Sequence, residues 1–495
     1  MYRKNAWENY DGEERARLSA FADAYRAFLD RSKTEREAAA SAERVCRAAG
    51  FQNLDDLIEA GAALMPGDRV YRKWMNKSFM AFVVGSESIE RGMRILGAHI
   101  DSPRIDVKQN PLFEDDSLAY LDTHYYGGIK KYQWLAMPLA LHGVIVKRDG
   151  SVVSVAIGEG EDDPVLCITD LLPHLAQDQM AKTASKFIDG EALNILIGSA
   201  PAGGDDKDPV KRAVLEVLKR DYGVEEEDFV SAELEAVPAG KARDAGLDRS
   251  MLLGYGHDDR VCAYPSLMAV ADYEGTPEMT LCAVLADKEE IGSVGASGMN
   301  SHFFENTVAE LAALMGCEKE LSVRRALQNS VMLSSDVSAG YDPTYSGVFE
   351  KKNAAMLNLG VCFNKYTGSR GKSGASDANA EFMAEVRRVM DDAGVCWQTS
   401  ELGKVDVGGG GTIAWLCAKY AMNVIDCGVP VLSMHAPWEI ISKADLWEAY
   451  KGDCAFLRAY DIKKHRGRRP MAVAPVLQGV IRTAGSPRSW GRTGG

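Results

Sequence analysis

Five short segments of the chain bring imidazole and carboxylate side chains to the ends of apolar runs. They are 97–103 (GAHIDSP), 256–260 (GHDDR), 287–293 (DKEEIGS), 334–338 (SSDVS) and 433–437 (SMHAP). Histidine together with Asp and Glu is a donor set that suits zinc and related divalent cations, and one carboxylate can bridge two cations with its two oxygens. A water held between two such cations loses a proton near neutral pH and becomes a nucleophile. The segments therefore predict a hydrolytic site with two divalent metal ions.

Two carboxylates next to each other, Glu289 and Glu290, allow two different roles. Neighbouring side chains diverge in an extended or turning segment, so one can bind metal while the other faces the water as general base. The pattern alone does not assign the roles. Asp101 stands two residues after His99, where it can accept the second imidazole N–H and fix the tautomer of a metal-bound histidine.

Nucleophilic catalysis by Ser or Cys fits the sequence less well. No cysteine lies in a segment that resembles a catalytic turn with histidine nearby, and Ser102 and Ser335 lack the pattern of a nucleophile elbow. Each of the five segments alone is common, because a histidine at a strand end is usually structural and an acidic pair is usually solvated. The metal interpretation depends on their occurrence together.

The elements around these segments alternate between strand and helix. Residues 78–84 and 93–98 are short, continuous apolar runs followed by turn-forming residues, as in buried strands. From residue 279 onward strand-like and helix-like patterns alternate, as in a doubly wound sheet, where ligands collect at the carboxyl ends of the strands. We therefore predict an α/β fold with a doubly wound mixed sheet that brings the five segments together.

Residues 109–245 differ in character from the rest of the chain. They are rich in β-like alternation, which is interrupted at Asp149-Gly150 by a hairpin signal. We predict a smaller β-rich domain here, for oligomerisation and control of access, inserted into a catalytic domain of residues 1–108 and 246–460. The basic segment 461–495, with its Pro and Gly, is predicted to be a disordered tail.

Charge and cysteine usage restrict the partners and the compartment. The 495 residues carry a formal net charge of -14, which argues against nucleic acid or an anionic membrane as main partner. The ten cysteines are scattered without a CxxC pair, as expected of reduced thiols. The first residues contain no apolar stretch of the kind that a signal peptide or anchor requires. These features predict a cytoplasmic protein.

The motifs HIDSP, HDDR, DKEEIGS, SSD and SMHAPWE occur in this order, with ELGKVDVGGGGT and ISKADLW besides. As a set they resemble the aspartyl aminopeptidase and aminopeptidase I family of metallopeptidases, over about residues 10–460. The resemblance implies a metalloaminopeptidase that hydrolyses the N-terminal peptide bond of unblocked peptides through a water activated between two divalent metals. It also implies two zinc ions per subunit, with cobalt or manganese as alternatives, and a homododecamer built from dimers.

The same resemblance assigns roles residue by residue. It divides the ligands between two ions: His99, Asp258 and Asp336 for one, and Asp258, Glu290 and His435 for the other. Asp258 is then the bridge, chosen over Asp259 because it matches the Asp-Asp/Asn-Arg element of the family. Glu289 is the general base and proton shuttle, and Asp101 orients His99.

The sequence departs from the family pattern in the segment LLPHLAQDQ. Relatives use a histidine of the neighbouring subunit here to stabilise the oxyanion, whereas this chain has His174 and, four residues later at the expected position, Asp178. An ionised acid cannot donate to an oxyanion, so the resemblance leaves that donor unassigned. Lys404, in the glycine-rich segment 404–412, is a candidate for selecting an acidic first residue. The alternative for that segment is a tight structural turn.

Two other functions are consistent with the same residues. A related two-metal exopeptidase or deacylase would cleave blocked substrates, such as N-acyl amides, with the same ligands. A non-catalytic scaffold or cargo homologue would keep the fold without turnover. The complete set of candidate ligands and the candidate base favours the enzyme.

Overall fold

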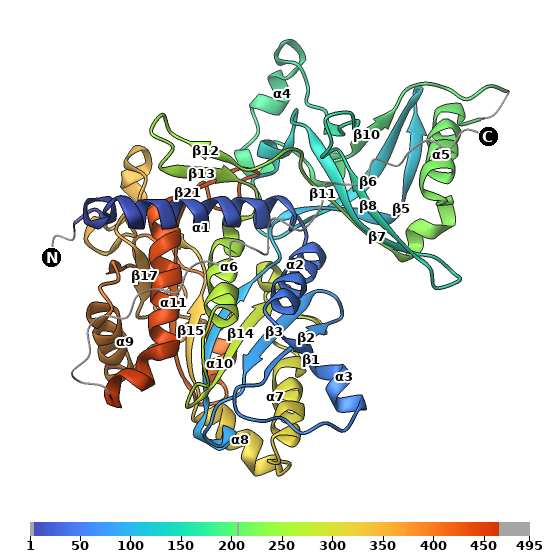
Figure 1. Ribbon diagram of the computed structural model, residues 1–495. Coiled ribbons are helices and arrows are strands. Elements are labelled where there is room, and N and C mark those ends of the chain that lie inside the picture. Colours follow the sequence, from blue (N-terminus) through green and yellow to red (C-terminus); the bar gives the residue numbers. More distant parts are fainter. Residues whose placement is uncertain (1–3, 205–206, 465–495) are drawn as a thin grey trace.

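The computed structural model describes residues 4–204 and 207–464, which form a mixed α/β structure with three sheets (Figure 1). The largest sheet has nine strands, and its central strands β14, β4 and β15 run parallel. In spatial order its strands are β1 (Gln52–Asn53), β2 (Arg69–Trp74), β3 (Ser78–Val83), β14 (Thr280–Ala286), β4 (Met93–His99), β15 (Val331–Ser335), β19 (Asn423–Gly428), β17 (Val361–Asn364) and β18 (Trp397–Thr399). Because β3 and β17 are antiparallel to their neighbours β14 and β19, the sheet is mixed, as predicted.

A second, seven-stranded sheet is antiparallel throughout and is drawn to the upper right in Figure 1. Its strands in spatial order are β8 (Val152–Ile157), β7 (Leu139–Val146), β11 (Ala232–Pro238), β5 (Arg104–Asp115), β6 (Leu118–Tyr126), β10 (Ile195–Gly198) and β9 (Cys167–Ile168). β7 and β8 form the hairpin predicted at Asp149-Gly150, where Gly150 has a φ of 85°. The sheet has its own apolar cluster, with Trp134 and Leu139 fully buried in it.

A third sheet of five short strands was not predicted from the sequence. It consists of β12 (Arg243–Ala245), β13 (Met251–Gly254), β21 (Glu439–Ser442), β20 (Pro430–Leu432) and β16 (Ser338–Ala339). β13 pairs with β21 over residues almost two hundred positions apart, so this sheet joins the segment after β11 to the C-terminal part of the chain. The loop that carries His435 connects β20 to β21.

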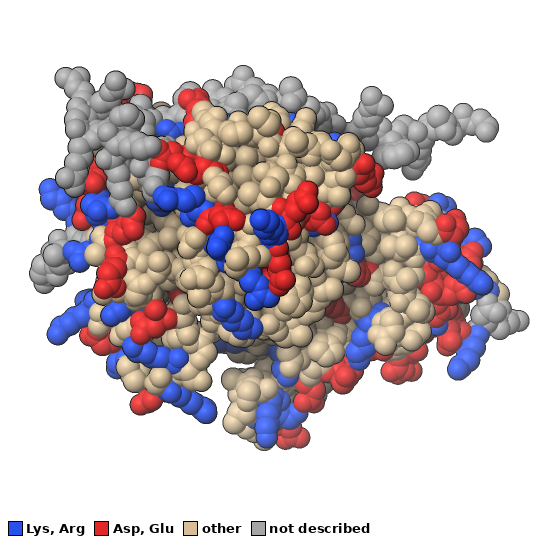
Figure 2. Space-filling model, turned by 90° about the horizontal axis from the view of Figure 1, so that it is seen from below, with Lys and Arg blue, Asp and Glu red and all other residues tan. Residues whose placement is uncertain are grey.

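The helices are α1 (Gly12–Asp30), α2 (Glu35–Ala48), α3 (Leu54–Glu59), α4 (Gln177–Met180), α5 (Pro209–Tyr222), α6 (His257–Ala271), α7 (Phe303–Leu314), α8 (Glu320–Gln328), α9 (Ala380–Asp392), α10 (Ala414–Ala418) and α11 (Lys443–Lys464). α11 continues into the segment predicted as a tail, of which residues 465–495 lie outside the described residues. None of the helices within the described ranges has the length and apolarity needed to cross a membrane. On the face shown in Figure 2, acidic and basic side chains both occur, and a broad tan area near the upper centre carries few of them.

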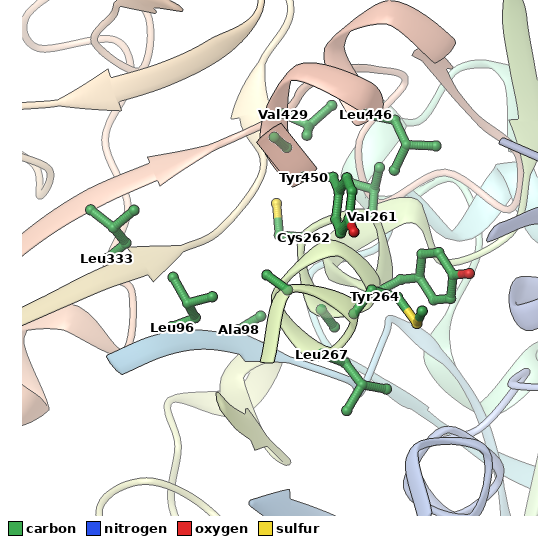
Figure 3. Packing of buried hydrophobic residues seen from close by; sticks show 14 of the residues in the cluster. Leu96, Ala98, Val261, Cys262, Tyr264, Leu267, Leu333, Val429, Leu446 and Tyr450 are labelled. Carbon is green, nitrogen blue, oxygen red and sulfur yellow. The ribbon is translucent and has the colours of Figure 1, made fainter. Parts of the chain in front are cut away.

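Two apolar clusters cover the two faces of the nine-stranded sheet. Along β4, Leu96 and Ala98 belong to the cluster with α1, α6 and α11, whereas Met93 and Ile95 belong to the cluster with α7 and α8. This division follows from the alternation of side chains in a strand, and burial of both faces explains the continuous apolar run. Figure 3 shows Leu96 and Ala98 beside α6 on the first face. The polar end of β4, His99, emerges from this packed centre.

Candidate metal centre

The five predicted segments meet at one edge of the nine-stranded sheet. His99 is the last residue of β4, and Asp336 directly follows β15. Glu289 and Glu290 lie in a short helix, η8 (Glu289–Ile291), shortly after β14. Since β14, β4 and β15 are adjacent and parallel, their carboxyl ends necessarily face the same edge. Asp258 reaches the same place from the start of α6.

The carboxylate of Asp258 lies between two imidazoles. Its Oδ1 is 3.2 Å from Nε2 of His99, and its Oδ2 is 3.2 Å from Nε2 of His435. Nε2 of His99 is also 3.8 Å from Oδ1 of Asp336, and Nε2 of His435 is 3.5 Å from Oε2 of Glu290. The structure thus brings together all five candidate ligands, with the two Asp258 oxygens facing different histidines.

Glu289 belongs to the same cluster. Its Oε2 is 3.9 Å from Nε2 of His99, and its carboxylate, His99 and Asp336 form a group whose donor atoms lie within 4.8 Å of one another. Glu289 is therefore near enough to bind the same ion as His99. Geometry alone does not separate a ligand from a base at this position.

Asp259 would be the bridging carboxylate if the match to the family motif were shifted by one residue. Its environment differs from that of Asp258. Its Oδ2 accepts a hydrogen bond from the backbone N–H of His99 at 3.3 Å, and its side chain is fully buried. Burial raises the pKa of Asp259 well above its usual value. It too lies within 4.8 Å of Asp258 and Asp336. His257, expected not to bind metal, instead contacts the hydroxyl of Tyr25 through Nδ1 at 2.8 Å.

Asp101 connects several parts of the cluster. Nδ1 of His99 lies 3.3 Å from Oδ1 of Asp101 and 3.1 Å from its backbone oxygen. The same carboxylate accepts hydrogen bonds from the backbone N–H groups of Glu289 at 3.1 Å and Glu290 at 3.2 Å. The hydroxyl of Tyr126 donates to its Oδ2 at 2.8 Å. Sequence analysis placed Asp101 beside His99 but did not identify Tyr126, whose only signal was an aromatic residue before the glycine pair in YYGG.

His435 is held by two groups that sequence analysis also missed. Its backbone N–H donates to Oε1 of Glu439 at 2.8 Å, while Oε2 of Glu439 accepts from the backbone N–H of Asp258 at 3.0 Å. Its Nδ1 lies 2.9 Å from the carbonyl oxygen of Gly128. Glu439 stands at the end of the SMHAPWE motif, so its presence there was a usable signal, whereas Gly128 comes from a distant segment.

The donor atoms fit divalent cations. Oδ1 of Asp258 and Oε1 of Glu290 are buried and have no hydrogen-bond partner among the described residues. Burial, reinforced by Asp336, raises the pKa of Glu289 to about 8, and burial with Asp258 raises that of Glu290 well above its usual value. Buried carboxylates this close to one another are either protonated or balanced by positive charge, and imidazole with carboxylate oxygen is a donor set that zinc accepts.

Zinc binding to the metal-free protein is expected to release protons at about pH 7. Burial lowers the pKa of the His435 imidazole, but Asp258 and Glu290 raise it, and the pKa is about 10. In the metal-free protein the imidazole is therefore protonated at pH 7. A ligating histidine must be neutral, so the apparent zinc affinity should rise with pH until about pH 10. Titration calorimetry in buffers of different ionisation enthalpy measures the release. A binding enthalpy independent of the buffer would contradict it.

A cavity of about 490 Å³ opens in front of the cluster. Among the described residues, its lining includes no Lys or Arg, and its ionisable members are Asp258, Glu289, Glu290, Asp336, Glu401, Asp426 and His435. The glycine-rich segment contributes Gly409, Gly410 and Gly411 to the wall. Lys404 is not part of the lining, because its Nζ donates to the carbonyl oxygen of Gly347 at 2.6 Å. His174 and Asp178 are exposed and also do not line this cavity.

The α/β fold has a mixed sheet with clustered His, Asp and Glu at its strand ends and a cavity in front of them. This arrangement defines the class of a metal-dependent hydrolase. The family model described as aminopeptidase I zinc metalloprotease (M18) matches residues 28–457. The chain belongs to this family and is a zinc-dependent aminopeptidase, so the predicted family and activity are confirmed.

Relatives and solved structures agree with the family match. The probable M18 family aminopeptidase 1 of Clostridium acetobutylicum is 55% identical over 455 residues, which are 92% of this chain and 98% of the relative. The crystal structure of an M18 family aminopeptidase from Thermotoga maritima has a TM-score of 0.88 at 43% identity, covering 92% of this chain and 99% of that one. The structure of the S. cerevisiae mApe1 dodecamer has a TM-score of 0.72 at 19% identity, covering 89% of this chain and 98% of that one. This similarity is one of fold.

Proposed function

We propose that this aminopeptidase works with two divalent cations bound at the edge of the nine-stranded sheet, zinc in preference to cobalt or manganese. The observation that carries the proposal is the position of Asp258, whose two oxygens each lie 3.2 Å from a different histidine. A carboxylate between two imidazoles suits a bridge between two ions. His99 and Asp336 would complete one site, and Glu290 and His435 the other.

Glu289 is proposed as the general base. Two cations at this centre would lower the pKa of a water that they share. The Glu289 carboxylate lines the cavity beside the candidate ligands, and its backbone N–H is fixed by Asp101 at 3.1 Å. It is thus placed to take the proton of the attacking water and to give it to the leaving amine. Asp101 would keep His99 in the tautomer that presents Nε2 to the metal.

We also propose that residues 109–245 form an inserted domain within a catalytic domain of residues 1–108 and 246–460. The separate antiparallel sheet and the separate apolar cluster support this division. Within the separate sheet, β5 begins at Arg104 and β11 ends at Pro238, a few residues before the two proposed boundaries.

We propose that the chain assembles into a homo-oligomer, specifically a dodecamer. The mApe1 structure is a dodecamer of that protein and shares the fold. Around α4, between β9 and β10, four large apolar side chains are more than 40% exposed: Leu171, Leu172, Leu175 and Met180. Such a group of apolar side chains favours a protein contact.

Peptides are the proposed substrates, and nucleic acid and membranes are not proposed as partners, because the net charge is -14. A cytoplasmic location is proposed because all ten cysteines are free thiols.

A panel of substrates tests the proposed function. Zinc-loaded enzyme should release nitroaniline from unblocked leucine and lysine nitroanilides and should leave their N-acetyl forms intact. Apart from the proposed ligands and base, the ionisable residues in the lining are Glu401 and Asp426, and no Lys or Arg is among the described lining residues, so glutamate nitroanilide should be hydrolysed at least about tenfold more slowly than either. Hydrolysis of the blocked forms alone would support the deacylase alternative, and no turnover of any substrate would support a scaffold. Removal of zinc with a chelator, followed by its return, should abolish and restore the activity.

A further inference from the structure

At and just after the end of β6 in the seven-stranded sheet, the chain contacts the residue that supports one candidate metal-binding histidine and contacts the other histidine directly. The hydroxyl of Tyr126 donates to Oδ2 of Asp101 at 2.8 Å, and Oδ1 of Asp101 lies 3.3 Å from Nδ1 of His99. Two residues after Tyr126, the carbonyl oxygen of Gly128 lies 2.9 Å from Nδ1 of His435. Both imidazoles thus present Nε2 to Asp258 while Nδ1 is held from the opposite side.

Glycine at position 128 favours this close approach. A Cβ atom there would lie 3.2 Å from Nδ1 of His435, closer than ordinary van der Waals contact. The preceding Gly127 has a φ of 77°, a conformation that L side chains rarely adopt. The two glycines therefore let the chain leave β6 and bring a backbone carbonyl against the imidazole.

Arg104 fixes Tyr126 from the neighbouring strand. Its guanidinium lies 3.8 Å from the centre of the Tyr126 ring, and Arg104 pairs with Tyr126 across β5 and β6. Arg104 in turn contacts Glu235 of β11 at 3.1 Å and Glu35 of α2 at 3.4 Å. Because α2 packs with the nine-stranded sheet, this buried ion cluster joins the two sheets directly behind Tyr126.

Tyr126 does not itself meet the substrate. Only 8% of the residue is exposed, and it is not among the residues that line the cavity. Its hydroxyl acts on Asp101, which also accepts the backbone N–H groups of Glu289 and Glu290. Without that hydroxyl the Asp101 carboxylate keeps these two bonds but loses the third one that limits its rotation, and its alignment with His99 becomes less defined.

We propose that Tyr126 is a positioning residue of the metal centre, and that residues 126–128 make the seven-stranded sheet part of the structure that binds the metals. This inference rests on the proposed roles of His99 and His435 as ligands. Hydrogen-bond partners of metal ligands commonly contribute 10–100-fold to metal affinity or activity. Asp101 and the Gly128 carbonyl are such partners, and Tyr126 acts through Asp101. The packing of the seven-stranded sheet against the nine-stranded sheet is therefore coupled to the binding of the metal ions.

The test is Tyr126→Phe in the full chain, with zinc affinity measured by competition with a chelator and the absorption spectrum of the cobalt-substituted protein. We expect zinc affinity to fall by about tenfold, the lower end of the range for a direct partner of a ligand, because Tyr126 acts through Asp101. The cobalt spectrum should change, and kcat at saturating zinc should fall with KM nearly unchanged. The matched control is Tyr255→Phe, because Tyr255 is equally buried and donates to the Pro103 carbonyl at 3.1 Å without contacting Asp101. It should keep the parent values.

Parent-like zinc affinity and cobalt spectrum in Tyr126→Phe would overturn the inference, as would an equal change in Tyr255→Phe. If Tyr126→Phe does not fold, Gly128→Ala tests the same segment, since its methyl group would press on the His435 imidazole at 3.2 Å and shift it by a few tenths of an ångström. That variant should bind one of the two ions at least about tenfold more weakly, and unchanged binding of both would also overturn the inference. A parent chain that binds no zinc would contradict the proposed metal centre itself, whereas two ions bound equally by parent and variants would contradict only this inference.

Discussion

Replacing Glu289 by Gln is expected to lower kcat by about 10²–10⁴-fold while both zinc ions stay bound. The amide has the size of the carboxylate and keeps one carbonyl oxygen, but it cannot accept the proton of the water or pass it to the leaving amine. The backbone N–H of residue 289 still donates to Asp101, so the segment should keep its place. Steady-state kinetics on leucine nitroanilide, combined with the zinc content of the same sample, measure both quantities.

The adjacent Glu290→Gln is the matched comparison, because it removes the same charge one residue away. Glu290 lies 3.5 Å from His435 and is the proposed ligand, so this variant should lose zinc as well as activity. The comparison is needed because Oε2 of Glu289 is itself only 3.9 Å from His99. Loss of zinc from Glu289→Gln would make Glu289 a ligand, and activity near that of the parent would remove it from the mechanism.

The gathering of the candidate ligands was predictable because it depends on local patterns and one topological rule. His99 and Asp336 stand where buried apolar runs end, and parallel strands present their carboxyl ends to one edge. The choice of Asp258 over Asp259 came from the family resemblance, since the sequence pattern at two adjacent acids is the same. The structure adds that only Asp258 faces both histidines within the distances given above.

The partners that orient these ligands could not be predicted in this way. Tyr126 and Gly128 reach the centre from a different sheet, so no spacing along the chain relates them to His99 or His435. Lys404 was a candidate for selecting an acidic first residue, but its Nζ donates to the Gly347 carbonyl and the residue does not line the cavity. Which way a side chain on a turn points depends on long-range packing.

The fold was also predictable only in part from the sequence. The strands of the nine-stranded sheet were visible because burial on both faces gives uninterrupted apolar runs, as in β4 and β14. The five-stranded sheet was missed because its strands contain two to four residues, as β16 and β21 do, too few to show a period. Its pairings also join segments that lie far apart in the chain. The sheet nevertheless matters for the site, since it holds the loop with His435.

Replacing Asp258 by Asn is expected to remove at least one of the two zinc ions and most of the activity with it. An amide offers one oxygen and no charge, so it cannot bind two cations as the carboxylate would. Main-chain contacts hold the residue independently of its side chain: its N–H donates to Glu439 at 3.0 Å, and its carbonyl accepts from Ser102 at 2.5 Å. The variant should therefore keep its backbone while zinc affinity falls by more than about 100-fold, beyond the effect of losing an outer partner.

Asp259→Asn is the control that separates the two adjacent acids. Asp259 contacts the backbone N–H of His99 rather than an imidazole nitrogen, and the remaining amide oxygen of Asn can still accept that hydrogen bond. We therefore expect Asp259→Asn to retain both ions, as measured by metal analysis after dialysis and by the cobalt spectrum. Retention in Asp258→Asn with loss in Asp259→Asn would shift the bridge by one residue.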